Sequence, residues 1–173
     1  MLGLQRGTIR IVAADPAWAT DFAEEHERLH AAIGHLVLDI QHIGSTAVPG
    51  LDAKPIIDIA IAVASPSAIE HCRPSLLAMG YQDRGDGGSD GGYLFVKESV
   101  SEVRTHHLHI VALDDPQWSN YQQFRDQLRT DDTLRDAYGA LKHRLKDDFA
   151  HNRRGYTDAK GPFIRRVLGD VDL

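Results

Sequence analysis

The sequence predicts an α+β fold in which helices pack on one face of a mixed, mostly antiparallel sheet. Two periodicities predict this class: short runs alternate apolar and polar residues, and longer runs repeat apolar residues at helical spacing. The resulting order is β-α-β-β-α-β-β-α-α. With 173 residues, 42% of them hydrophobic and 25% charged, the chain has the size and composition of a single globular domain over residues 1–173.

The N-terminal part of the chain is expected to form a strand, a helix and a second strand. Residues 8–12 have the composition of the first strand. Asp15 suits a helix N-cap, and Pro16 suits the first helical position because its missing N–H costs nothing there. Apolar residues at helical spacing predict a helix over residues 18–33, and residues 36–43 alternate as a strand.

The next strand has two different faces. Residues 44–55 are a turn segment that contains glycine and proline, and residues 56–63 then read as a strand. One face of that strand is continuously aliphatic, whereas the other carries Asp58 with Ala60 and Ala62. Because the neighbours of Asp58 are small, we expect a ligand to be able to approach its carboxylate.

A helix, two strands and then further helices are expected in the rest of the chain. A helix begins at Ser65-Pro66, with Pro74 predicted to kink or divide it. The glycine-rich residues 85–92 lack the Gly-Lys-Ser/Thr of a nucleotide P-loop and are typical of a hairpin connection. Residues 93–97 and 106–113 are antiparallel strands. The remaining elements are two helices with apolar stripes over residues 121–128 and 134–149, and a basic loop and short helix over residues 151–168.

Composition excludes several classes of protein. The only cysteine, Cys72, cannot form an intrachain disulfide, and the most apolar run, residues 56–64, is too short to span a membrane. Residues 1–6 lack the features of a signal peptide, so we expect a cytoplasmic protein. A net charge of −6 does not suit nucleic-acid binding, although residues 142–166 hold eight Lys or Arg against three Asp or Glu and could meet a phosphate.

Two groups of residues could carry chemistry. Gly44, Ser45 and Thr46 follow a strand and could present hydroxyl and N–H groups to phosphate oxygens. A carboxylate in mid-strand, as at Asp58, is costly unless it is paired or holds a metal. His107 and His109 share one face of a strand, about 7 Å apart, and indicate either a metal or acid–base site or a structural pair of hydrogen-bonded imidazoles.

Further residues could assist such a site. The strand-end His42 is a candidate fourth ligand beside Asp58, His107 and His109. Lys54, Lys160 and the pair Arg153-Arg154 are candidate phosphate-binding residues, with solvent-exposed surface charge as the alternative.

The chain resembles the GrpB family. The resemblance rests on His42-Ile43-Gly44-Ser45-Thr46-Ala47-Val48-Pro49-Gly50-Leu51 and Ala53-Lys54-Pro55-Ile56-Ile57-Asp58-Ile59. It extends to Asp15-Pro16-Ala17-Trp18, His107-Leu108-His109, Tyr156, Ala159-Lys160 and Phe163-Ile164. That family is similar to the nucleotidyltransferase superfamily with the DNA polymerase β-like palm, which implies a nucleotidyltransferase-like fold.

The superfamily resemblance also implies a site. Its pattern is Gly-Ser at a helix start, a strand with Asp-x-Asp, and a third carboxylate on a later strand, which together hold two magnesium ions. This chain matches Gly44-Ser45 and Asp58, but Ala60 stands at the second carboxylate, and His107 or His109 is the candidate for the third. Because histidine prefers zinc or manganese to magnesium, we expect a divalent metal of uncertain identity: Mg, Mn or Zn.

Three functions follow as alternatives. The first is transfer of a nucleotidyl group from a nucleoside triphosphate to a small acceptor, with Asp58, His107 and His109 as catalytic residues and metal ligands. The second is binding of a nucleotide or another small phosphorylated ligand without turnover, which Ala60 favours. The third is a metal-dependent hydrolase that uses the same histidines and carboxylate.

Overall fold

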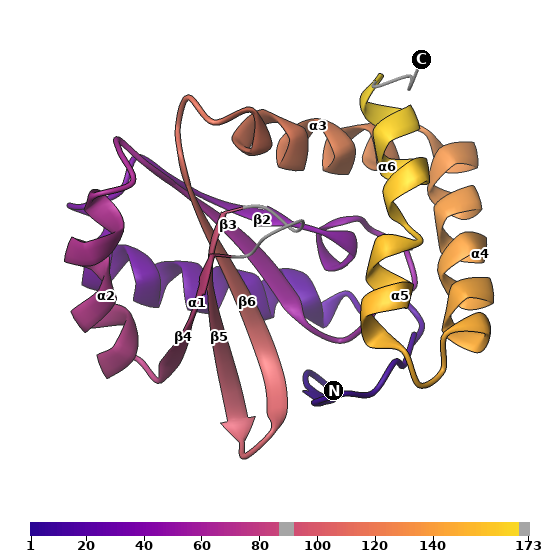
Figure 1. Ribbon diagram of the computed structural model, residues 1–173, viewed down its shortest axis with the longest axis horizontal. Helices are drawn as coiled ribbons and strands as arrows, with labels where there is room; N and C mark the ends of the chain where they lie inside the picture. The colour runs from indigo at the N-terminus through magenta and orange to yellow at the C-terminus, as the bar shows by residue number, and fades with distance from the viewer. Residues whose placement is uncertain (87–91, 170–173) are drawn as a thin grey trace.

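The computed structural model describes residues 1–86 and 92–169 and has a six-stranded sheet at its centre (Figure 1). The β3–β6 pair is parallel and the other pairs are antiparallel. The predicted α+β class with a mixed, mostly antiparallel sheet is therefore confirmed. The strand order is β2 (Asp39–Ile43), β3 (Ile57–Val63), β6 (Val103–Ala112), β5 (Tyr93–Val100) and β4 (Tyr81–Asp86), with β1 (Leu4–Gln5) paired to β6.

Helices lie on both faces of the sheet. α1 (Ala17–Ile33) and α2 (Ala68–Ala78) cover the aliphatic face of β3. α3 (Pro116–Thr130) packs on the opposite face, where Trp118 contacts Ala60 and its neighbours. The expectation of helices on one face thus describes α1 and α2 only, because the alanines of β3 leave a shallow apolar surface that the large Trp118 side chain fills.

The C-terminal helices lie beside the turn that follows β2 (Figure 1). They are α4 (Asp132–Asp148), α5 (Arg153–Asp158) and α6 (Gly161–Leu168). A separate apolar cluster, which includes Leu51 and Tyr138, joins them to that turn and to α3. Side chains that are distant in sequence from β2 and β3 therefore come close to Asp58.

The N-terminal elements differ from the prediction. Residues 8–12 do not form a strand, apart from a bridge between Val12 and Ala53, and the first strand is β1. β2 begins at Asp39 rather than at residue 36. The Asp15 carboxylate accepts a hydrogen bond from the Ala17 N–H at 3.0 Å, but the N-cap of α1 is Pro16, one residue later than predicted.

Two later elements also differ. β4 was not predicted, because only its first residue, Tyr81, is fully buried and the rest is polar with a bulge between Asp83 and Gly85. α2 runs through Pro74 and is not divided there. The predicted loop over residues 85–92 lies largely outside the described residues.

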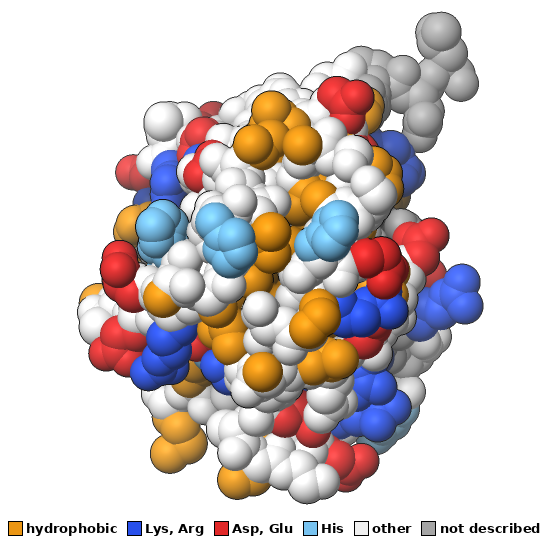
Figure 2. Space-filling view, turned by 90° about the vertical axis from the view of Figure 1, so that its left-hand side faces the viewer, with side chains coloured by type: hydrophobic (Ala, Val, Ile, Leu, Met, Phe, Trp, Pro, Cys, Tyr) orange, Lys and Arg blue, Asp and Glu red, His pale blue; other side chains and the backbone are white. Residues whose placement is uncertain are grey.

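No helix within residues 1–86 and 92–169 has the length and apolar character needed to cross a membrane. Figure 2 views the end of the molecule that lies on the left of Figure 1, where α2 is found. Hydrophobic side chains are visible there among histidine and charged side chains. Exposed large hydrophobic residues include Leu77 of α2, which is 48% exposed.

Candidate functional site

Asp58 lies directly against Gly44. Ile43, the last residue of β2, is in register with Asp58 on β3, so the chain turns at Gly44 next to the carboxylate. Gly44 has a φ of 68°, and a Cβ atom at this position would lie 2.6 Å from Oδ2 of Asp58. Both the backbone angle and the close approach of Asp58 therefore require glycine here.

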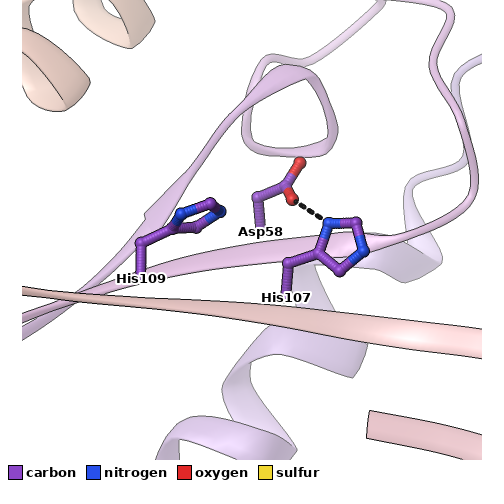
Figure 3. Close-up of side chains that lie close together, drawn as sticks. All are labelled: Asp58, His107 and His109. Carbon is purple, nitrogen blue, oxygen red and sulfur yellow. Dashed lines mark hydrogen bonds and ion pairs between the residues drawn. The ribbon is translucent and has the colours of Figure 1, made fainter. Parts of the chain in front are cut away.

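Asp58, His107 and His109 form one cluster (Figure 3). Parallel pairing of β3 with β6 places His107 opposite Asp58 and His109 opposite Ala60. Since both histidines point to the same face as Asp58, Nδ1 of His107 lies 3.1 Å from Oδ1 of Asp58. One ligand atom from each of the three residues lies within 4.8 Å of the others.

The electrostatic surroundings keep Asp58 ionised. Burial is the largest single influence and would raise its pKa. The hydrogen bond with His107 and the electrostatic interactions with His107, His109 and Lys160 together outweigh it, so the pKa of Asp58 lies below its ordinary value. The carboxylate is therefore negatively charged at neutral pH and can act as a metal ligand.

The cluster fits a divalent metal of borderline softness. Two ligand atoms each about 2.1 Å from one metal are about 3.0–3.4 Å apart in octahedral or tetrahedral geometry. The 3.1 Å distance from His107 Nδ1 to Asp58 Oδ1, which is also that of a hydrogen bond, lies in this range, whereas separations of up to 4.8 Å within the cluster would have to shorten for all three residues to bind one ion. Two imidazoles with one carboxylate suit zinc or manganese better than magnesium, which prefers oxygen ligands.

Ser45 contacts a buried lysine that the sequence did not reveal as a site residue. Lys142 of α4 is 3% exposed, and its Nζ donates a hydrogen bond to Ser45 Oγ at 2.9 Å and another to the Asp52 carbonyl. Burial, reinforced by Lys160, lowers the pKa of Lys142 to about 7, although Asp52 and Asp58 oppose the change. Lys142 lies on the buried face of α4 together with Tyr138. A lysine at a position where helical spacing predicts a buried residue is unusual, and this was the feature of the sequence that could have identified Lys142 as a site residue.

Two further lysines lie on the rim of this region. Lys54 Nζ is 4.0 Å from the centre of the Tyr156 ring, and Lys160 Nζ is 5.1 Å from the same centre. We refer to Lys54, Lys142 and Lys160 as the lysine cluster. It places positive charge beside Asp58 and Ser45, which is the environment that a polyphosphate requires.

The structure does not bring His42 to the cluster, so its assignment as a metal ligand is corrected. His42 is in register with Ile59 and therefore points to the face opposite Asp58. There it stacks on Phe22 at 4.5 Å between ring centres, and its Nε2 lies 3.0 Å from Thr46 Oγ1. Burial lowers the pKa of His42 to about 4, so the ring is neutral at pH 7.

Two other candidates also have different surroundings from those expected. The Thr46 hydroxyl is buried between His42 and the carbonyl of Ile56, which leaves it turned away from a phosphate. Ser45–Ala47 form a single turn of 3-10 helix (η1) rather than the start of an α-helix. The Arg154 side chain is 94% exposed and pairs with Asp158, so it does not fold over the site.

Sequence comparison identifies relatives over nearly the whole chain. The family model described as GrpB protein matches residues 8–170. The UPF0157 protein PA4798 of Pseudomonas aeruginosa is 37% identical over 163 residues, which are 93% of this chain and 66% of that protein. The glutamate-rich protein GrpB of Alkalihalophilus pseudofirmus is 33% identical over 99% of this chain and 100% of its own length. The chain thus spans the whole of one relative and about two-thirds of the other.

Solved structures agree with these matches. The crystal structure of conserved protein GrpB from Enterococcus faecalis is 31% identical, with a TM-score of 0.82, over 93% of this chain and 96% of that one. Cid1 poly(U) polymerase with MgGTP bound is 11% identical, with a TM-score of 0.56, over 86% of this chain and 50% of that one. The match to Cid1 poly(U) polymerase shows a shared nucleotidyltransferase-like fold. The GrpB family model covers residues 8–170, and the GrpB and UPF0157 relatives named above are 31–37% identical to this chain. The chain belongs to the GrpB family.

Proposed function

We propose that this protein transfers a nucleotidyl group from a nucleoside triphosphate to a small acceptor, with the help of a divalent metal. The observation that carries the proposal is the Asp58–His107–His109 cluster beside Gly44 and Ser45. It supplies a metal-binding donor set next to a Gly-Ser turn, in a fold similar to that of Cid1 poly(U) polymerase, whose solved structures include MgGTP and Mg 3′-dATP complexes.

Ser45 and the lysine cluster would bind the phosphates of the nucleotide. The Ser45 hydroxyl and Lys142 would contact the terminal phosphates, and Lys54 and Lys160 would neutralise the remaining charge. The Lys142 ammonium already faces Ser45 Oγ, so a phosphate oxygen could replace the hydroxyl as its partner without a large movement. In this arrangement the pyrophosphate leaving group is held on the α4–α6 side of Asp58.

Asp58 and the two histidines would hold the metal. A divalent ion bound there polarises a phosphoryl oxygen and increases the acidity of an acceptor hydroxyl. In the transfer, the acceptor oxygen would form a bond to the α-phosphorus, the bond from that phosphorus to pyrophosphate would break, and the hydroxyl proton would pass to water. His107 and His109 would each hold the metal through one nitrogen, and the other nitrogen of each neutral ring already carries a proton.

Nucleotide binding without turnover is the second candidate, and Ala60 is the observation that favours it. A buried alanine stands where the superfamily pattern has a second carboxylate, which leaves one carboxylate in the cluster. A pair of magnesium ions would be bound poorly by that donor set. In this case triphosphates would stabilise the fold and no pyrophosphate would form.

Measurement of pyrophosphate release separates the candidates. The wild type, incubated with each nucleoside triphosphate, a pool of small hydroxyl-bearing acceptors and Mn²⁺ or Zn²⁺, should release pyrophosphate. Asp58→Asn should reduce the rate by at least about 100-fold, because an amide is a poorer metal ligand, while keeping most of the thermal stabilisation by nucleotide. Thermal stabilisation without pyrophosphate in the wild type would support binding alone, and release of orthophosphate instead would indicate a hydrolase. Absence of both stabilisation and release would contradict the proposal.

A further inference from the structure

A second group of basic side chains lines a small cleft on the other side of Lys54. The cleft is formed by the N-terminal segment, the start of β6 and the first residue of α5, and its cationic lining residues are Arg6, Lys54, Arg104 and Arg153. Figure 1 shows the N-terminal segment and α5 next to each other at this position. Its volume is about 10 Å³, which is space for about one water-sized group.

The three arginines of this cleft carry positive charge that no ion pair within the described residues neutralises. Among residues 1–86 and 92–169, neither Arg6, Arg104 nor Arg153 forms an ion pair, and Nε of Arg104 is buried without a hydrogen-bond partner. Burial and the charges of Arg153, Arg84 and Arg6 lower the pKa of Arg104 to about 10, and Glu98, which is paired in register with Arg104 on β5, acts against them. Glu98 itself accepts hydrogen bonds from Gln82 and from the Glu102 N–H.

An arrangement of this kind is unfavourable until an anion arrives. Three guanidinium groups in one cleft repel each other, and each of them presents N–H donors suited to a planar or tetrahedral oxyanion. The cleft admits one compact group only, so a phosphate or carboxylate would bind at its mouth between the side chains. Arg6 is exposed and Arg153 is partly exposed, so both side chains can adjust to the anion.

The Tyr156 ring links the cleft to the surroundings of the candidate active site. Lys54 lines the cleft and also lies over the Tyr156 ring, which Lys160 contacts as well. Lys160 in turn contributes to the field at Asp58. A ligand held by Arg104 and Arg153 would thus lie on the Lys54 side of the site, away from Lys142 and Ser45, where the triphosphate is expected.

We infer that the cleft lined by Arg6, Lys54, Arg104 and Arg153 binds the anionic group of the acceptor, which is therefore a small molecule bearing a phosphate or carboxylate. That the bound molecule is the acceptor rests on the proposed function, whereas the binding of an anion rests on the cleft alone. Lys54 belongs to both the lysine cluster and the arginine-lined cleft, so it would then lie between the triphosphate and the anionic group of the acceptor.

Anion binding at this cleft can be measured independently of catalysis. Ser45→Glu places a negative charge in the triphosphate region, so inorganic phosphate should bind this variant only at the cleft. Calorimetric titration and thermal stabilisation with inorganic phosphate, at constant ionic strength set with chloride, would be compared for Ser45→Glu alone, with Arg153→Gln and with Arg154→Gln. Arg154 is the matched control because it is the adjacent arginine of α5, is 94% exposed and does not line the cleft.

Adding Arg153→Gln should weaken phosphate binding by about tenfold, the effect of one charge-assisted hydrogen bond, and Arg154→Gln should leave it unchanged. Arg104→Gln in the same background should have an effect at least as large, with circular dichroism used to confirm folding. Equal affinity in the Arg153 and Arg154 variants, or no phosphate binding to Ser45→Glu, would overturn the inference. Failure of the wild type to bind triphosphates would contradict the proposed function and leave this comparison intact.

Discussion

Lys142 offers a sharp test because stability and binding should respond to its loss in opposite directions. A buried ammonium is costly, so removing it should stabilise the fold where the unfolded chain is protonated. If the same group binds phosphate, its removal should also weaken nucleotide binding. Methionine is the appropriate replacement, since it has a similar length and no charge.

The magnitude follows from the pKa of Lys142. It falls from an ordinary 10.5 to about 7 in the folded protein. Between these values the unfolded chain holds more protons than the folded one, so stability rises as the pH increases through this window. At about 1.4 kcal/mol per pH unit, raising the pH from 6 to 9.5 should stabilise the wild type by about 3 kcal/mol relative to Lys142→Met.

At pH 6 the variant should be the more stable protein. The full difference in pKa corresponds to a charge cost of about 5 kcal/mol. Methionine leaves Ser45 Oγ and the Asp52 carbonyl without their donor, which costs about 1–3 kcal/mol. The net expectation at pH 6 is therefore that the variant is more stable by about 2–4 kcal/mol, and this difference shrinks as the pH is raised.

Urea unfolding at pH 6, 8 and 9.5, followed by the fluorescence of the buried Trp18 and Trp118, measures these differences. Lys146→Met is the control, since Lys146 is on the same helix, is 34% exposed and pairs with Asp147. The Lys142 variant should also bind triphosphates at least about tenfold more weakly at pH 7. A pH-independent difference in stability would refute the lowered pKa, and unchanged triphosphate affinity would refute the phosphate-binding role.

Two further predictions concern the metal cluster. Gly44→Ala should lower stability by about 1–3 kcal/mol in urea unfolding and weaken Zn²⁺ binding in calorimetry, because the added methyl group both strains the φ of 68° and displaces the Asp58 carboxylate. Unchanged Zn²⁺ affinity in this variant would show that Asp58 is not a ligand. Calorimetry on metal-free wild type should show Zn²⁺ and Mn²⁺ binding more tightly than Mg²⁺, since two of the three donors are imidazoles. Mg²⁺ binding of equal strength would mean that other oxygen ligands complete the site.

The parts of the site that were predictable from sequence are those fixed by strand alternation. Asp58 among alanines, and His107 two residues before His109, each define one face of a strand without knowledge of the partner strand. The two helices on the aliphatic face and the Gly44 turn follow from equally local patterns. Such features depend on a few neighbouring residues, so the sequence specifies them directly.

The parts that were missed depend on register and on contacts between distant segments. Whether His42 or Ile43 shares the face of Asp58 is decided by the β2–β3 register, which the sequence does not specify. Lys142 meets Ser45 across 97 residues, through the packing of α4 against the turn after β2. β4 pairs through its backbone, so its polar composition gave a weak strand signal.

The β3–β6 register bears on how Ala60 should be interpreted. Ala60 is fully buried, lies in one cluster with Trp118, and is paired in register with His109 on the adjacent parallel strand. Neighbouring strands are about 4.8 Å apart, so a small side chain at position 60 leaves space on this face for the imidazole of His109. The third donor is therefore supplied from β6 as a nitrogen, and the cluster keeps three ligand atoms within 4.8 Å of one another. The His109 imidazole, which also packs against Tyr121, can supply a donor in place of the missing carboxylate, and this is why we favour metal-assisted transfer over binding alone.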